Sequence, residues 1–237
     1  MISIIIPTFN EAAAIEETLA AVKLLFGDTE IIVADGGSDD KTAAIARELG
    51  AIVVESPRGR GDQMHAAALV SSGEILWFVH ADSRPAPVAL NEIRVALEDS
   101  SVVAGNFTLR FAGESRPAKF MTWFYRQIRN IGLLYGDSGI FVRRDAYEQV
   151  GGFKPLPLFE DLDFVYRLRT IGMLVTLNAE IVTSSRRFEN RAFLPVFARW
   201  IVFQCLYWIG VSPHTMAGIY HSEKENPSRG VLRPDEE

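Results

Sequence analysis

The stretch ILWFVHADSRP, residues 75–85, contains the most hydrophobic strand that the sequence predicts. Residues 75–79 are apolar throughout, which is typical of a strand buried on both faces of a parallel sheet. The apolar run then ends in His80-Ala81-Asp82, and two prolines follow soon after. Because a buried strand has no packing use for a carboxylate at its end, Asp82 is a candidate functional residue.

Short apolar runs and segments of helical periodicity alternate from residue 2 up to this stretch. The predicted strands cover residues 2–6, 30–34, 51–55 and 74–80, and the predicted helices cover residues 11–25, 40–49 and 62–72. This alternation predicts an α/β fold of Rossmann type, with a mostly parallel central sheet and helices on both faces. Ligands of such sheets bind outside the carboxyl ends of the strands.

Polar residues follow each of these four strands. They are Pro7-Thr8-Phe9-Asn10-Glu11, Asp35-Gly36-Gly37-Ser38-Asp39-Asp40, Arg58-Gly59-Arg60-Gly61 and His80-Ala81-Asp82. Carboxylates, backbone amides in glycine-rich turns and two arginines are the groups that bind a nucleoside diphosphate and a divalent cation. Each motif alone has an ordinary structural explanation: Asp35 would shape its own turn, Asp40 would cap a helix, and residues 58–61 would form a solvated loop. Four such motifs at successive strand ends favour a binding site.

The pattern changes after residue 90. A strand is predicted over residues 102–111, a basic and aromatic helix over 117–131, a short strand over 136–142, and a helix from about 159 to 169. We expect this α+β part to hold the second substrate. Its helix carries Phe120, Trp123, Phe124 and Tyr125, for which we predict a partly exposed aromatic surface over the cleft.

In order and spacing, five segments resemble the inverting glycosyltransferases of family 2, which have the GT-A fold. The segments are IIIPTFNE, VADGGSDDKT, ILWFVHADS, GDSGIFVRRDAYEQVGGF and FEDLDF, within residues 2–188. The short chain and the segments RGRGDQM, HADS and SSRRF are more similar to a compact bacterial subgroup, some members of which are linked to arsenosugar biosynthesis genes. The resemblance implies a hexosyl-type transferase with a UDP- or GDP-sugar donor and a Mg2+ or Mn2+ cofactor.

The resemblance also implies a role for individual residues. Pro7, Thr8 and Glu11 would line the nucleoside, Asp35 would contact the base, Arg60 and Gly61 would lie near the nucleotide, Asp82 would bind the metal, and Asp161 would be the catalytic base, supported by Glu160. His80 stands where many relatives have an Asp. His80 is expected either to contact the ribose or to be a core histidine whose hydrogen bonds are satisfied. Ala81, next to it, is expected to border the nucleotide. Asp137, Arg186 and Arg187 are expected on the acceptor and diphosphate side, with solvated surface positions as the alternative for the two arginines.

The expected organisation is a single GT-A domain with a C-terminal addition. Residues 1–98 form the nucleotide-sugar-binding half, 99–191 the acceptor and catalytic half, 192–221 an amphipathic helical segment, and 222–237 a loose polar tail. Residues 192–211 have about the length of a membrane-spanning helix, but Arg199 and Gln204 interrupt them. We therefore expect a helix that packs on the domain or lies at a membrane interface.

Composition limits the partners and the setting. The net charge of −6 argues against nucleic acid, because phosphate attraction needs a basic surface. The single cysteine, Cys205, and an N-terminus without a basic segment predict a reducing, cytoplasmic setting. The expected acceptor is a sugar, a lipid or a small molecule, and the pattern is compatible with peripheral membrane contact and with a homodimer. The competing functions are a sugar-phosphate nucleotidyltransferase and a non-catalytic binding subunit with the same fold.

Overall fold

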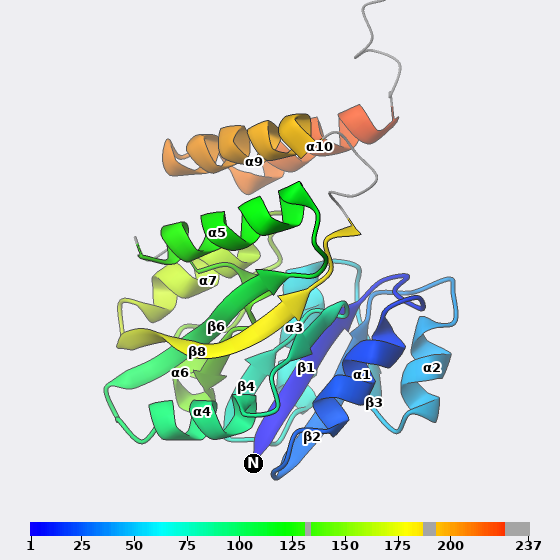
Figure 1. Ribbon diagram of the computed structural model, residues 1–237, viewed down its shortest axis with the longest axis vertical. Helices are drawn as coiled ribbons and strands as arrows, with labels where there is room; N and C mark the ends of the chain where they lie inside the picture. Colours follow the sequence, from blue (N-terminus) through cyan, green and yellow to red (C-terminus); the bar gives the residue numbers. More distant parts are fainter. Residues whose placement is uncertain (131–133, 187–192, 226–237) are drawn as a thin grey trace, which may run out of the picture.

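The computed structural model describes residues 1–130, 134–186 and 193–225. Within these ranges, eight strands form one sheet in the order β3-β2-β1-β4-β7-β6-β8-β5, which extends through both predicted halves of the domain (Figure 1). The strands are β1 (Ile2–Thr8), β2 (Thr29–Asp35), β3 (Ile52–Glu55), β4 (Ile75–Phe78), β5 (Ser83–Pro85), β6 (Val102–Phe111), β7 (Phe141–Arg143) and β8 (Met173–Thr183).

The first four strands of the sheet order are parallel, as the sequence predicts. β1 lies between β2 and β4, and β2 pairs with β3, all in parallel register. Beyond β4 the sheet is mixed, because β7 pairs antiparallel with both β4 and β6, whereas β6 and β8 are parallel. The predicted α/β class with a mostly parallel sheet is therefore confirmed, and the carboxyl ends of β1, β2, β3 and β4 share one edge.

Helices cover both faces of the sheet because successive side chains of a buried strand point to opposite sides. Ile4 and Ile6 of β1 pack in one core cluster and Ile5 packs in the other, and all three are fully buried. The first face carries α1 (Ile15–Lys23), α2 (Thr42–Glu48), α4 (Ala89–Ala96) and α5 (Arg116–Asn130). The second face carries α3 (Arg60–Val70), α6 (Arg144–Gln149) and α7 (Glu160–Leu168).

Two further helices lie beyond α5. Figure 1 shows α9 (Phe193–Trp208) and α10 (Pro213–Glu225) as an outer layer at the end of the molecule farthest from β2. Since α10 ends at Glu225, residues 222–225 of the segment expected to be a loose tail are helical. Several apolar side chains of this layer are exposed, namely Leu194, Ile201, Val202, Trp208, Ile209 and Ile219.

Among the helices in the described ranges, none combines the length and the apolar character needed to cross a bilayer.

Candidate active site

The carboxyl ends of β1 and β2 are held together by a buried amide. Gln63 of α3 donates its Nε2 hydrogens to the carbonyl oxygens of Thr8, at 2.5 Å, and Ala34, at 2.9 Å. Thr8 is buried, and its hydroxyl donates to the Asp35 carboxylate at 3.2 Å. These bonds fix the rim from which Glu11 and the Asp35 turn extend.

Asp35 is buried and is used by its own turn. Its Oδ1 accepts from the Ser38 hydroxyl at 2.6 Å, and its Oδ2 accepts from the Ser38 backbone N–H at 2.9 Å. Asp35 therefore shapes its own turn, which is the structural alternative that the sequence offered. An ionised carboxylate has about four acceptor positions, so Asp35 retains capacity for a further donor. The expected contact with a nucleotide base stays a prediction.

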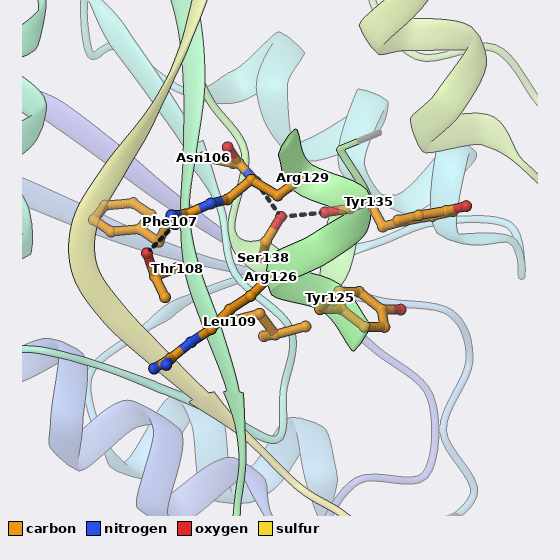
Figure 2. Close-up of a pocket in the computed structure, with 9 residues that line it drawn as sticks. All are labelled: Asn106, Phe107, Thr108, Leu109, Tyr125, Arg126, Arg129, Tyr135 and Ser138. Atoms are coloured by element: carbon orange, nitrogen blue, oxygen red, sulfur yellow. Dashed lines mark hydrogen bonds between the residues drawn. The ribbon is translucent and has the colours of Figure 1, made fainter. Parts of the chain in front are cut away.

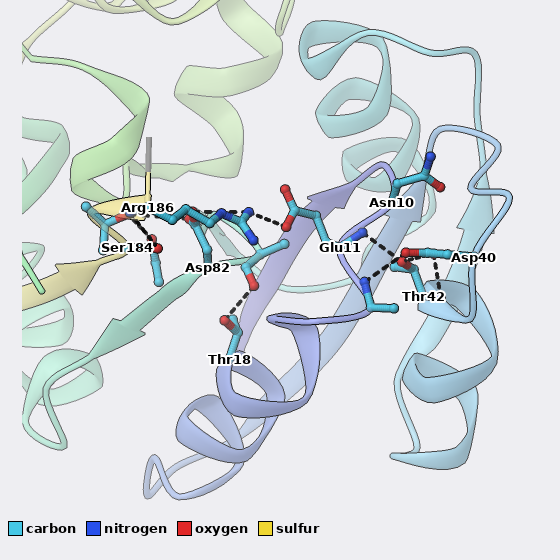
Figure 3. A network of polar contacts seen from close by, with 12 residues as sticks. Asn10, Glu11, Thr18, Asp40, Thr42, Asp82, Ser184 and Arg186 are labelled. Carbon is cyan, nitrogen blue, oxygen red and sulfur yellow. Dashed lines mark hydrogen bonds and ion pairs between the residues drawn. The ribbon is translucent and has the colours of Figure 1, made fainter. Parts of the chain in front are cut away.

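An arginine from the end of β8 bridges two carboxylates across this rim. Arg186 forms a charge-assisted hydrogen bond with Glu11, and its Nη2 lies 3.5 Å from Asp82 Oδ2 (Figure 3). Hydrogen bonding to Glu11 raises the pKa of Arg186, and the charges of Glu11 and Asp82 add to this shift. Two carboxylates from the ends of β1 and β4 therefore converge on one cationic group.

This convergence bears on the divalent cation implied by the resemblance. Glu11 and Asp82 supply carboxylate oxygens, which are the donors that Mg2+ and Mn2+ prefer, and they already hold a positive charge between them. No group of three or more His, Cys, Asp or Glu side chains arranged for a metal occurs in the described part of the chain. The residues present therefore fit a cation that takes its remaining ligands from a bound diphosphate or from water.

A second polar cluster forms where α3, α7 and the turn after α5 meet. Arg60 pairs with Glu160 at 2.5 Å and lies 3.9 Å from Asp137, whose carboxylate is 3.0 Å from His80 Nδ1. Asp161 accepts the backbone N–H of Gly136 on Oδ2 at 2.6 Å. A Cβ built on Gly136 would lie 3.2 Å from that oxygen and 3.4 Å from His80 Nε2, so the turn at Gly136 stands between these two side chains.

The Asp161 carboxyl is a perturbed acid. Burial is the main cause that raises its pKa to about 6, and the neighbouring Glu160 charge raises it further. The Arg60 charge and the Gly136 N–H oppose this shift without cancelling it. Burial lowers the pKa of Arg60, but the charges of Glu160, Asp161 and Asp137 outweigh that effect and hold it above its ordinary value. Asp161 is therefore a buried carboxylate that can accept a proton near neutral pH.

Hydrogen bonds to the central sheet hold the turn whose Gly136 N–H contacts Asp161. The Ser138 hydroxyl donates to the Tyr135 carbonyl at 2.5 Å and accepts from Asn106 Nδ2 at 2.7 Å, as Figure 2 shows. Asn106 belongs to β6, so the central sheet fixes the position of the Gly136 N–H. The small recess drawn in Figure 2 is about 10 Å³ in volume, and Asn106, Tyr135 and Ser138 are among the residues that line it.

The residue before the acidic pair adopts an unusual backbone conformation. Phe159 precedes α7 with φ of 60°, in the left-handed region that residues other than glycine rarely adopt. Its ring packs on Tyr207 of α9 with centroids 4.7 Å apart. Backbone strain of this kind persists where the surrounding structure fixes it, and it is concentrated at functional sites. Here it sets the direction in which Glu160 and Asp161 enter the helix.

A cavity of about 290 Å³ opens beside Asp161, between α5 and α9. Asp161, Asp137 and Arg60 lie at its polar end, and most of the remaining wall is apolar or aromatic. The wall residues are Phe124, Tyr125, Ile128, Tyr135, Leu158, Phe159, Phe197, Trp200, Ile201, Phe203, Gln204, Cys205 and Trp208. The prediction of a partly exposed aromatic surface is confirmed, since Phe120 and Trp123 are 37% and 56% exposed. Of these four residues, only Phe124 and Tyr125 line the cavity, and Phe120 and Trp123 lie outside its lining.

The predicted site residues thus fall into two groups along one edge of the sheet. Thr8, Asp35, Glu11, Asp82 and Arg186 form the rim group, whereas Arg60, His80, Asp137, Glu160 and Asp161 form the second cluster.

Three other predicted residues are packed within the fold, and their expected contacts with the nucleotide stay predictions. Pro7 and Ala81 are buried, and the Ala81 carbonyl accepts the Thr18 hydroxyl at 2.7 Å. Gly61 packs against the chain at Lys154, whose carbonyl oxygen would lie 2.3 Å from a Cβ. Arg187 lies outside the described residues.

Among the wall residues that the sequence analysis did not predict for the site, Tyr135 and Gln204 form a polar pair. The Tyr135 hydroxyl donates to Gln204 Oε1 at 2.7 Å. Burial raises the pKa of Tyr135, with the nearby Asp161 charge as the next cause, so the phenol remains protonated. A glutamine inside an otherwise apolar helical segment was the available signal for Gln204, whereas Tyr135 has no local signal.

A family model and a curated protein both match this chain. The family model described as Glycosyl transferase family 2 matches residues 3–151. The chain is similar to the Probable glycosyltransferase YdaM of Bacillus subtilis, with 25% identity over 80% of this chain and 51% of that protein. The chain thus spans about half the length of this curated relative.

Two solved structures share the fold. One is the mannosyltransferase PcManGT of Pyrobaculum calidifontis in complex with GDP-Man and Mn2+, with a TM-score of 0.66 and 22% identity over 81% of this chain and 58% of that chain. The other is glucosyl-3-phosphoglycerate synthase of Mycobacterium tuberculosis with Mn2+, UDP and glucosyl-3-phosphoglycerate, with a TM-score of 0.60 and 21% identity over 87% of this chain and 79% of that chain. The predicted GT-A fold is therefore confirmed.

Proposed function

We propose that this chain, which belongs to glycosyl transferase family 2, transfers a sugar from a nucleotide-sugar donor to an acceptor hydroxyl with inversion at the anomeric carbon. The observation that carries the proposal is the position of Asp161. It is a buried carboxyl with a pKa of about 6, oriented by a backbone N–H and facing a cavity large enough for an acceptor.

The reaction needs one general base on the acceptor side. Asp161 would take the proton of the acceptor hydroxyl as that oxygen attacks the anomeric carbon, and the proton would end on the carboxylate. A base with a pKa close to the working pH combines the ionised state with useful basicity. Glu160 would act through Arg60, since their ion pair fixes the start of α7 beside the base. Inversion needs no protein nucleophile, because a single displacement forms no covalent sugar–enzyme intermediate.

The donor would lie over the rim group. Asp82, with Glu11 beside it, would hold Mg2+ or Mn2+, which when bound supplies positive charge to a departing diphosphate. Arg186, whose Nη2 lies 3.5 Å from Asp82, would add a protein cation beside that diphosphate. The rim turns at Pro7, Thr8 and Asp35, together with His80 and Ala81, would border the nucleoside. The complexes of the two similar structures with GDP-Man or UDP and Mn2+ support a UDP- or GDP-sugar as donor.

The test is donor turnover by the purified chain. A panel of UDP- and GDP-sugars is incubated with and without Mn2+, and release of the nucleoside diphosphate is followed. We expect Mn2+-dependent release from at least one donor by the wild type, and loss of release in both Asp82→Asn and Asp161→Asn. The exposed Asp145 gives a matched control, Asp145→Asn, which should retain the activity. Release by the Asp82→Asn variant at the wild-type rate would refute the assigned metal site.

A further inference from the structure

The cavity between α5 and α9 has a composition that selects its ligand. Its apolar wall is built by two helices that face each other, with Phe124 and Ile128 from α5 and Phe197 and Trp200 from α9. An apolar cavity of roughly 150 Å³ accepts a benzene ring. At about 290 Å³, this cavity has room for an apolar body of roughly twice that size. A free sugar or another small polar acceptor would leave this wall without a partner.

The charges at the polar end argue against an anionic ligand. The charged residues of the lining are Arg60, Asp137 and Asp161, so acids outnumber bases there. Arg60 is already paired with Glu160 at 2.5 Å and lies 3.9 Å from Asp137. A phosphate bound beside Asp161 would meet two carboxylates and no uncommitted cation among the lining residues. An uncharged ligand is the better fit.

Within the described residues, one buried side-chain nitrogen of the wall has no hydrogen-bond partner. Gln204 is only 7% exposed, and its Oε1 accepts from the Tyr135 hydroxyl at 2.7 Å. Its Nε2 has no hydrogen-bond partner within the described part of the chain. Buried amide hydrogens are rarely left unpaired, because such a group has given up its bonds to water. An oxygen of a bound ligand would satisfy this donor.

We infer that this cavity is the acceptor site and that the acceptor is an uncharged alcohol with an apolar body and a second oxygen near the reacting hydroxyl. The reacting hydroxyl faces Asp161, the second oxygen accepts from Gln204 Nε2, and the apolar body lies between α5 and α9. This inference rests on the proposed function for the role of Asp161. It adds the chemical class of the acceptor, which the proposed function leaves open.

The test measures binding without a donor, so that it is independent of turnover. The probes are 1,2-alkanediols of four to twelve carbons, used below their aggregation concentration. Binding is followed by the change in tryptophan fluorescence, to which Trp200 and Trp208 of the cavity wall contribute. Each buried methylene should tighten Kd about fourfold until the cavity is filled at roughly ten carbons. Decyl phosphate should bind at least tenfold more weakly than 1,2-decanediol.

Three variants locate the binding. Ile128→Trp fills the cavity and should weaken 1,2-decanediol at least tenfold. Gln204→Leu should remove the preference for the diol over 1-decanol of equal chain length, and it tests the site separately should the larger tryptophan impair folding. Trp123→Ala is the control, because Trp123 also belongs to α5 but is 56% exposed and lies outside the cavity lining. This variant should leave Kd unchanged.

Kd independent of chain length would overturn the inference. Tighter binding of decyl phosphate would identify a lipid phosphate instead, and equal losses in Trp123→Ala and Ile128→Trp would identify a surface patch. If the diols bind as expected while no nucleotide sugar is turned over, the proposed function fails. The assignment of the cavity as a binding site for an uncharged diol with an apolar body then still stands.

Discussion

Replacing Asp161 by asparagine should stabilise the protein at neutral pH while strongly reducing its turnover. The carboxyl is buried, and burial raises its pKa from 3.8 to about 6. An acid whose pKa is raised by folding disfavours the folded state wherever the group is ionised. The cost is absent below the unfolded pKa, near 4, grows between pH 4 and pH 6, and is complete above pH 6. The asparagine side chain carries no charge and keeps an oxygen for the Gly136 N–H.

The shift of about two pKa units corresponds to about 3 kcal/mol. The free energy of unfolding of Asp161→Asn relative to the wild type should therefore rise by about 3 kcal/mol between pH 4 and pH 7. Urea denaturation at several pH values measures this difference, and nucleotide-sugar turnover is measured in parallel. General-base assistance is worth about 10²- to 10⁴-fold, so turnover should fall by that order.

A carboxylate on the same helix provides the control. Asp163 pairs with Arg167 at 2.7 Å and with Lys154 at 3.3 Å, so Asp163→Asn should destabilise the protein at pH 7. The reasoning about Asp161 is refuted if Asp161→Asn becomes less stable than the wild type as pH rises from 4 to 7. That result would mean that attraction to Arg60 exceeds the cost of burial.

Three further predictions address single features of the structure. Because Asp161 must be ionised to act as a base, kcat/KM should rise tenfold per pH unit up to about pH 6 and then level off, and a flat profile between pH 5 and pH 7 would exclude this role. Arg186→Ala should tighten Mn2+ binding in the absence of nucleotide, because it removes the cation that competes for Glu11 and Asp82. Calorimetry measures this affinity, and an unchanged Mn2+ affinity would contradict this account. Gly61→Ala should destabilise the protein by about 1–3 kcal/mol, because its Cβ would meet the Lys154 carbonyl. The control Gly218→Ala, where a Cβ would lie in open space, should not destabilise it. Urea denaturation that finds Gly61→Ala as stable as the wild type would show that Gly61 is not a packing position.

The first half of the fold could be predicted from the sequence because its signals are local. Apolar runs, helical periodicity and the residues at strand ends place β1 to β4 and their shared edge. β8 was not predicted, although it pairs with both β6 and β5. Its segment MLVTLNAEIVT contains Asn178 and Glu180, which break the apolar pattern. Glu180 is tolerated because it pairs with Arg110 and Arg126.

The candidate site shows the same division. The types of residue at the strand ends indicated a nucleotide and metal rim, and the acidic start of α7 indicated a base. Which residues meet could not be predicted where a contact joins distant parts of the chain. Arg60 was expected beside the nucleotide, but its shortest ion pair is with Glu160. Arg186 pairs with Glu11, which lies 175 residues away in the sequence. The Gln204 and Tyr135 pair likewise depends on how α9 packs over the cavity.

The stereochemistry of sugar transfer tests the central claim most directly. An α-linked nucleotide sugar that passes the turnover panel is hydrolysed by the wild type, with water in place of the acceptor. The anomeric configuration of the first product is read by 1H NMR before mutarotation equilibrates it. A single displacement assisted by Asp161 predicts the β-anomer first. Initial release of the α-anomer would contradict the account, because retention requires a second displacement that the proposed site does not provide.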